Sequence, residues 1–158
     1  MASGGELPVV DGLAQLSFVV YGLLERRAAE EEVSIIQTRL LGVLRDRRPT
    51  MLELAHLLGL DKSSVSGLVD RAEHRGLVER DPSAEDRRVI RVALTAAGRA
   101  RVDEVAARFE ADVASLLEHL APAQRRTLSR LLSHLLVSDA ADHGVDLFDT
   151  IEEAPHRG

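Results

Sequence analysis

The sequence contains no cysteine and no tryptophan, and its only aromatic residues are three Phe and one Tyr. The absence of cysteine excludes disulfide bonds and any thiol-based redox switch. No apolar run approaches the roughly 18 residues that a transmembrane helix requires. The amino-terminal stretch has neither the basic segment nor the apolar segment of a signal peptide. These absences predict a soluble, cytoplasmic protein.

An excess of positive charge is also missing. The formal net charge of −6 argues against a protein that coats nucleic acid without selectivity. The charge is uneven, however. Residues 61–101 contain nine Arg or Lys against seven Asp or Glu (+2), whereas the remainder contains eleven against nineteen (−8). Positive charge is therefore concentrated in the centre of the chain.

The chain of 158 residues, 45% of them hydrophobic, suits one domain or two small lobes that share a core. Its periodicities predict a mostly α protein with one small β-hairpin. After a frayed start, Asp11 is expected to cap the first helix, and Ser34 with Gln37 forms a capping box for the second. Thr95 is expected to cap a long fifth helix that ends near Leu120. A sixth helix is expected from about Pro122, and the stretch after Ser138 is expected to be a tail containing Val145, Leu147 and Phe148.

The central segment predicts a third helix, a tight turn and a fourth helix. Thr50 and Glu53 form a second capping box, and Gly59 follows the third helix where a positive φ is needed. Asp61 is expected to cap the fourth helix, which continues to about Arg75. Two strands are then expected at residues 77–80 and 89–94, with Pro82 in the loop between them.

Four packing positions in this segment have the spacing of a helix-turn-helix. Ala55 is small where the two helices cross, Gly59 makes the turn, and Val65 and Leu68 anchor the second helix. An ordinary helical hairpin would satisfy the same four positions. The hairpin that follows, with two adjacent arginines, favours a winged helix that binds DNA in both grooves.

Polar residues in the first two turns of the fourth helix are candidates for DNA contact, because short hydroxyls allow close approach to bases and phosphates. The alternative is a serine-rich helix start without a partner. Farther along the same helix, Arg71 and Arg75 could reach phosphates, or either could pair with Asp70 or Glu79. The full set of candidates on this helix is Lys62, Ser63, Ser64, Ser66, Gly67, Arg71 and Arg75.

The predicted loop carries Glu85, Asp86, Arg87 and Arg88. An arginine at a loop tip can enter a narrow minor groove, where the negative potential is enhanced. Asp86 could hold that arginine by a charge-assisted hydrogen bond. The alternative is a solvated cluster of charges.

Residues 60–98 resemble the MarR family of bacterial transcription regulators. The resemblance rests on Val65, Leu68, Val69, Asp70 and Arg71, then Gly76-Leu77-Val78 and Arg80, then Asp86-x-Arg88, and finally Leu94-Thr95-x-x-Gly98. It implies a homodimer of winged helices that binds pseudo-palindromic DNA, often to repress, and that releases DNA when a small aromatic or anionic effector binds. It also implies that Asp86 and Arg88 form a pair in the wing and that Ser63, Ser64 and Ser66 face the major groove. Many relatives carry a basic or larger polar residue at the position of Gly67, which has no side chain. Fewer direct contacts with bases are therefore expected, with more weight on the wing and on DNA shape.

The resemblance divides the chain into a dimerisation region, residues 11–48 and 96–150, and a DNA-binding domain, residues 49–95. Apolar stripes on the first, fifth and sixth helices exceed what so small a domain needs for its own core. An effector pocket is expected where these helices meet the winged domain, and Phe18, Tyr21, Thr38 and Phe109 are candidates to lie near it, although such residues are more often simply part of the core. The lack of tryptophan argues against the urate-responsive branch of the family.

Other functions have weaker support. The six histidines lack metal-ligand spacing. His119 and His134, with Glu118, could form a zinc site. The simpler alternative is that both are surface histidines. No catalytic or phosphate-binding motif occurs, so the chain is not expected to be an enzyme and no cofactor is expected. A winged helix that serves as a protein-interaction module or anti-regulator without binding DNA remains the second hypothesis.

Overall fold

The computed structural model describes residues 5–82 and 86–142 and confirms a mostly α fold with one β-hairpin. In chain order the elements are α1 (Val9–Glu30), α2 (Ile35–Arg45), α3 (Met51–Leu58), α4 (Lys62–His74), β1 (Val78–Pro82), β2 (Ile90–Leu94), α5 (Ala96–Leu117) and α6 (Pro122–Asp142). None of the helices in this described part of the chain is long and apolar enough to cross a membrane.

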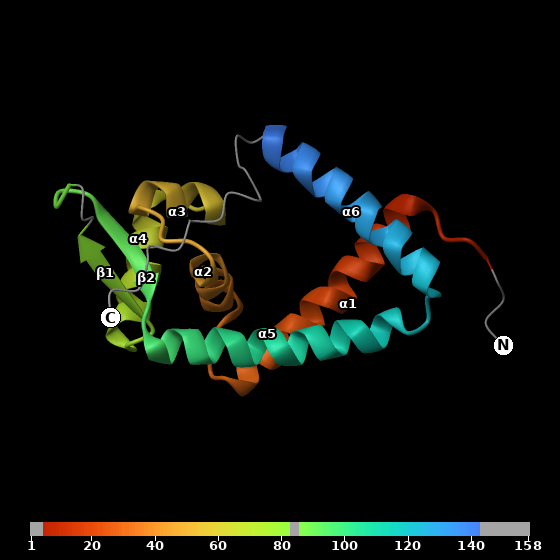
Figure 1. Cartoon of the computed structure of the whole chain (residues 1–158), viewed down its shortest axis with the longest axis horizontal. Coiled ribbons are helices and arrows are strands. Elements are labelled where there is room, and N and C mark those ends of the chain that lie inside the picture. Colours follow the sequence, from red (N-terminus) through yellow and green to blue (C-terminus); the bar gives the residue numbers. More distant parts are fainter. Residues whose placement is uncertain (1–4, 83–85, 143–158) are drawn as a thin grey trace.

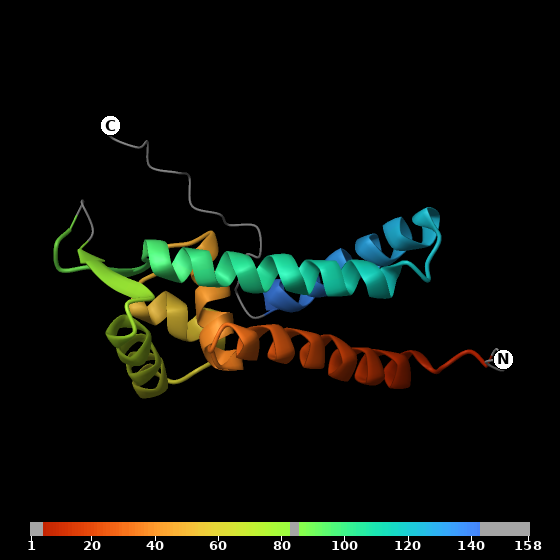
Figure 2. The same ribbon diagram turned by 90° about the horizontal axis from the view of Figure 1, so that it is seen from below.

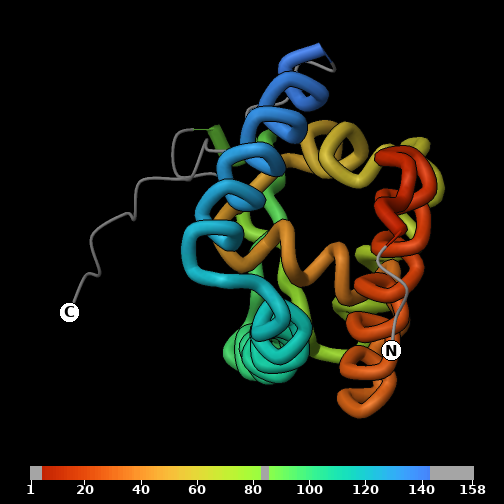
Figure 3. The backbone as a smooth tube through the Cα atoms, turned by 90° about the vertical axis from the view of Figure 1, so that its right-hand side faces the viewer, coloured from red at the N-terminus to blue at the C-terminus, as the bar shows by residue number. Residues whose placement is uncertain are grey.

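The elements form a head at one end and a scaffold of long helices at the other (Figure 1). The head contains α3, α4 and the hairpin. Helices α1 and α5 run side by side away from it (Figure 2). Viewed along the scaffold, α2 lies between α1 and α5, while α6 lies well apart from α1 (Figure 3). Because α2 packs on both long helices and on the hairpin, it joins the head to the scaffold.

Most helix starts follow the local chemistry that the sequence predicts. Both halves of the Ser34–Gln37 capping box and of the Thr50–Glu53 capping box are present. The side chain of Thr95 accepts a hydrogen bond from the backbone N–H of Gly98 at the start of α5. Gly59 ends α3 with a φ of 64°, as expected for a left-handed residue after a helix.

Several boundaries differ from the expectation, and four of the differences have a bearing on the fold. Helix α1 starts after Pro8 rather than after Asp11, which lies in its first turn, where a carboxylate is favourable to the helix dipole. Pro82 is the last residue of β1 rather than part of the loop, since an edge strand tolerates the missing N–H. Helix α5 stops at Leu117 instead of Leu120. Helix α6 continues past Ser138 to Asp142, and Val145, Leu147 and Phe148 lie outside the described residues.

The hairpin is antiparallel, and its register pairs Val78 with Leu94 and Pro82 with Ile90. Its base is tied to the segment before α3. Val92 N–H donates to the carbonyl of Pro49 at 2.9 Å, and Arg91 Nη1 donates to the carbonyl of Arg48 at 3.0 Å. The direction of the wing is therefore fixed relative to the start of α3.

The tightest part of the core lies in and next to the head. Its largest fully buried side chains come from α2, α3, α4 and the hairpin: Leu40, Leu41, Leu54, Leu58, Val65, Leu68, Val69, Val78 and Val92. Farther from the head, α1 and α6 present large apolar side chains to solvent. The exposed set on these two helices is Val9, Val10, Leu13, Leu16, Phe18, Val19, Tyr21, Leu131, Leu132, Leu135, Leu136 and Val137.

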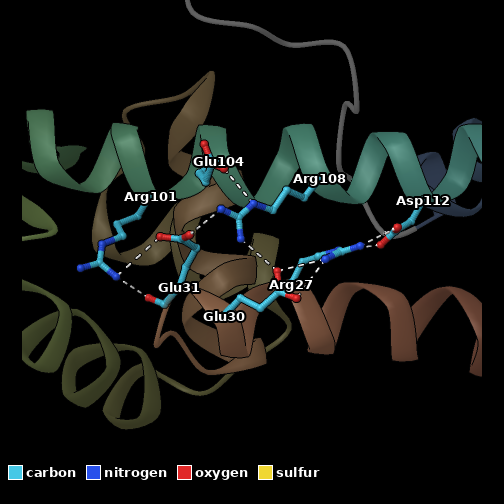
Figure 4. A network of polar contacts seen from close by, with 7 residues as sticks. All are labelled: Arg27, Glu30, Glu31, Arg101, Glu104, Arg108 and Asp112. Carbon is cyan, nitrogen blue, oxygen red and sulfur yellow. Dashed lines mark hydrogen bonds and ion pairs between the residues drawn. The ribbon is translucent and has the colours of Figure 1, made fainter.

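A network of ion pairs fastens α1 to α5 beside the α1–α2 turn (Figure 4). Arg27 binds both carboxylate oxygens of Asp112 at 2.7 Å and also pairs with Glu30 at 2.9 Å. Arg108 pairs with Glu30 at 3.0 Å. The bond from Arg27 holds the pKa of the Asp112 carboxyl below its usual range, and bonds from Arg27 and Arg108 lower the pKa of Glu30. Fixed pairs of this kind hold the two helices at a set angle.

Candidate nucleic-acid interface

Helix α4 divides its side chains between the core and the surface as the sequence predicts. Val65, Leu68 and Val69 are buried against the rest of the head. Lys62, Ser63, Ser64 and Arg71 are exposed, and Ser66 and Gly67 are half-buried. Of the cationic candidates on α4, Lys62 and Arg71 have no hydrogen bond or ion pair with any described residue. Both cations are therefore available to a ligand.

The serines at the start of α4 are held by the N-cap carboxylate. The Ser63 and Ser64 hydroxyls donate to the two oxygens of Asp61 at 2.7 and 2.5 Å, and Ser64 N–H donates to the same carboxylate at 2.9 Å. These bonds strongly lower the pKa of the Asp61 carboxyl, and the bond from the Ser64 hydroxyl contributes most. The hydroxyls keep their lone pairs but use their protons inside the helix start. They can therefore accept a hydrogen bond from a base amino group more readily than they can donate to a phosphate.

Gly67 makes room for Arg71. A Cβ at position 67 would lie 3.2 Å from Nη1 of Arg71. The guanidinium thus lies over the helix one turn before its own Cα, as helical side chains generally lean. The missing side chain at Gly67 is therefore compensated by the cation four residues later, at the same patch of helix surface.

Arg75 makes intramolecular hydrogen bonds, one of the two roles that the sequence left open, but with partners other than those expected. Its guanidinium donates to Oε1 of Gln37 at 2.9 Å and to the carbonyl of Glu32 at 2.8 Å. The intramolecular partners expected were Asp70 and Glu79, but the observed ones belong to α2 and to the α1–α2 turn. Sequence spacing could not reveal these partners, because they lie about 40 residues away in the chain.

Asp70 is instead bound by Arg80 of β1, which contacts Glu73 as well. The hydrogen bond to Asp70 is the main cause that raises the pKa of Arg80. This clamp ties the exposed side of α4 to the base of the hairpin. In the sequence, Arg80 stands out only through the family resemblance, although two carboxylates three residues apart on one helix face signal a shared cation.

The wing loop ends in a turn from Asp86 to Val89. Val89 N–H donates to the carbonyl of Asp86, and Arg88 N–H donates to Oδ1 of Asp86, each at 2.9 Å. Arg87 and Arg88 therefore occupy the two central positions of the turn, and both are exposed. The bond observed for Asp86 goes to the backbone of Arg88 rather than to a guanidinium, so Asp86 shapes the turn that carries the arginines. Glu85 lies outside the described residues.

Comparison with known proteins agrees with this geometry. The model of the MarR family matches residues 32–89, which cover α2, α3, α4 and the first half of the hairpin. Residues 32–89 are therefore similar to the MarR family, whose members regulate transcription through a winged helix-turn-helix.

Individual relatives extend the MarR-type likeness to most of the chain. The transcriptional repressor YetL of Bacillus subtilis is 25% identical over 134 residues, or 83% of this chain and 80% of YetL. The transcriptional repressor NicR of Pseudomonas putida is 33% identical over 82 residues, and this match spans only about half of each protein, 51% of this chain and 52% of NicR. The crystal structure of Rv1404 from Mycobacterium tuberculosis is 29% identical with a TM-score of 0.70, covering 85% of this chain and 96% of that structure.

A cavity of about 520 Å³ lies where α2 and α5 meet the head. Leu24, Val102 and Phe109 contribute apolar walls. The charged lining residues are Arg39, Arg45, Asp46 and Arg47, and Arg45 is paired with Asp103 at 3.2 Å. Of the four aromatic and polar residues that the sequence suggested for such a pocket, Thr38 and Phe109 line it. Phe18 and Tyr21 do not, and these two residues of α1 are 72% and 51% exposed.

The histidine site has no support in the described residues. His119 and His134 are both exposed, and no three His, Cys, Asp or Glu side chains within residues 5–82 and 86–142 lie close enough together to hold a metal ion.

Proposed function

We propose that this chain is a regulator of the MarR type, a homodimeric, sequence-specific DNA-binding repressor. The observation that carries the proposal is that two exposed cationic elements occur on one head: the outer face of α4, with Lys62 and Arg71, and the wing turn, with Arg87 and Arg88. In this proposal α4 enters the major groove through Lys62, Ser63, Ser64, Ser66, Gly67 and Arg71, and the wing reaches the minor groove. Repression is suggested by the two curated relatives, which are both named as repressors.

The dimer is proposed from the apolar side chains that the single chain leaves uncovered. Helix α6 makes no extensive contact with another element of the described chain, and Leu131, Leu135 and Leu136 are more than half exposed along it. Covering apolar surface of this size stabilises association at roughly 25 cal/mol per Å². A second copy, presenting the same faces of α1 and α6, is the natural cover, because a two-fold interface is self-complementary.

In the proposed dimer, residues 11–48 and 96–150 form the dimerisation region and residues 49–95 form the DNA-binding domain. The two recognition helices would then lie about 34 Å apart, one helical turn of DNA. The paired half-sites compensate for the few contacts that one head can make, which is consistent with the net negative charge of the whole chain.

The cavity between scaffold and head is proposed as an effector site. Its volume of about 520 Å³ lies within the ordinary range for small-molecule pockets. Apolar walls beside arginines suit a small aromatic anion. Titration with benzoate, and with uncharged benzamide as the matched control, tests this assignment. Benzoate is expected to bind more tightly, and equal affinity for the two compounds would contradict a role for the arginines.

Salt-dependent binding tests the DNA-reading assignment. Genomic fragments retained by the purified protein provide the probe, and affinity is measured over a series of salt concentrations. Arg88→Ala is expected to weaken binding to all fragments and to reduce the salt slope by about one phosphate contact. Arg126→Ala on α6 is the control, because it removes an exposed arginine outside the head. Unchanged affinity of Arg88→Ala would refute the wing assignment, and the absence of any retained fragment would favour the interaction-module alternative.

A further inference from the structure

Arg75 occupies the junction between the recognition helix and the scaffold. It is the C-cap of α4, so its position follows any rotation or tilt of that helix. Its side chain leaves the head and reaches the turn where α1 ends and α2 begins. There it donates one hydrogen bond to Gln37 and one to the carbonyl of Glu32.

Both acceptors are themselves held in place. Gln37 is buried, with 8% of its surface exposed, and its Oε1 also accepts from Ser34 N–H at 3.2 Å as part of the α2 capping box. Glu32 has a φ of 56°, a conformation that non-glycine residues rarely adopt. It follows α1 in a closed turn, in which Glu32 N–H bonds to Ala29 and Val33 N–H bonds to Ala28, each at 3.0 Å.

A second arginine, from α5, binds the same turn. Arg101 of α5 donates to the carbonyl of Glu31 at 2.5 Å. Two arginines, one from α4 and one from α5, thus bind adjacent carbonyls of the α1–α2 turn. The contacts at this turn therefore fix the orientation of α4 relative to both long helices of the scaffold, α1 and α5.

We infer that Arg75 is a positioning residue that sets the orientation of α4 against α1, rather than a residue that binds DNA. This inference rests on the proposed function, in which the scaffold holds two α4 helices at the spacing of successive major grooves. Two of the five N–H donors of Arg75 are used inside the protein, and these two bonds hold its guanidinium at the turn. The loss of Arg75 would loosen the spacing of the two helices without removing a DNA contact.

The salt slope separates positioning from contact. Arg71→Ala removes a cation from the reading face and is expected to reduce the slope by about one. Arg75→Ala is expected to lower affinity for a retained genomic fragment about tenfold, comparable to one mismatched base pair, with the parent's slope. A slope reduced by about one in Arg75→Ala, or the parent's affinity, would overturn the inference.

Substitutions at Gln37 provide a matched pair. Gln37→Glu preserves an acceptor for Arg75 and for the capping box, so it is expected to keep the parent's affinity. Gln37→Met removes that acceptor and is expected to reproduce Arg75→Ala. The double variant Arg75→Ala with Gln37→Met is expected to lose less affinity than the two single losses added together, because both substitutions remove the contact between Arg75 and Gln37. Additive losses would overturn the inference.

A measurement without DNA keeps this inference separate from the proposed function. The chain has no cysteine, so Glu25→Cys on α1 and His74→Cys on α4, both exposed positions, give two specific spin-label sites. Mixing the labelled chain with excess unlabelled chain isolates the distance within one chain. Arg75→Ala is expected to broaden this distance distribution, whereas Arg71→Ala leaves it narrow. An unchanged distribution in Arg75→Ala would refute the positioning role even if DNA binding fails for another reason.

Discussion

Gly98 lies where α5 begins against the start of the hairpin, and its replacement provides a sharp test of that packing. A Cβ at this position would lie 1.8 Å from the carbonyl oxygen of Leu77 and 2.8 Å from its carbonyl carbon. A carbon normally approaches a carbonyl oxygen no closer than about 3.3 Å, so the helix start must move by roughly 1.5 Å. The atoms in conflict belong to the backbone, so a change of side-chain rotamer cannot relieve the conflict.

The displacement would break contacts that hold α5. Thr95 N–H donates to the carbonyl of Leu77 at 3.1 Å, and the Thr95 hydroxyl donates to the carbonyl of Gly76 at 2.6 Å. Each hydrogen bond contributes about 1 kcal/mol to stability, and overpacking adds about 1–3 kcal/mol. The better helix propensity of alanine returns about 1 kcal/mol. Gly98→Ala is therefore expected to destabilise the protein by about 2–4 kcal/mol.

Thermal unfolding at one fixed protein concentration, followed by circular dichroism, measures this change. For a chain of this size the loss corresponds to a fall in Tm of about 4–16 °C, at 2–4 °C for each kcal/mol. Gly42→Ala is the control, because it lies in α2 with no atom within 4 Å of the added Cβ. It is expected to keep or slightly raise the Tm. Equal Tm values for the two variants would refute the close approach at Gly98.

Three further predictions concern the interface and the scaffold. Asp61 has a lowered pKa in the folded state, so its contribution to stability is complete above the unfolded value of about 4 and is lost as the pH falls below it. Asp61→Asn should therefore unfold at lower urea than the parent at pH 7, with a gap that narrows at about pH 3; a gap that is the same at both pH values would contradict the role of the charge. Gly67→Ala meets only the flexible end of Arg71, so we expect an unchanged or higher Tm together with an altered preference among retained DNA fragments, and an unaltered preference would contradict the placement of Arg71. Leu135→Glu puts a charge on the exposed apolar face of α6 and should shift the sedimentation coefficient from dimer to monomer, whereas a dimer that persists would place the interface elsewhere.

The sequence predicted features that depend on neighbouring residues. The capping boxes at Ser34 and Thr50 and the caps at Asp61 and Thr95 follow from short-range hydrogen bonding, so reading a few adjacent residues was enough. The buried side of α4 was predicted for a similar reason, since helical periodicity identifies the face that packs.

Features that depend on distant residues were not predicted. The partners of Arg75 and the two-carboxylate clamp of Arg80 form only when the chain brings separate elements together. The close contact of Gly98 with Leu77 likewise arises where α5 packs on the start of the hairpin. Phe18 and Tyr21 were misplaced because periodicity identifies an apolar face without saying what covers it.

The most direct test of the central proposal is a hydroxyl-radical footprint of the protein on a genomic fragment that it retains. A dimer with one α4 in each of two successive major grooves predicts paired protected patches on one face of the DNA, with half-site centres about 10 base pairs apart. The wing is proposed to protect the DNA next to these patches. This additional protection should weaken in the double variant Arg87→Ala/Arg88→Ala. A single unpaired patch, or no protection on any retained fragment, would contradict the account.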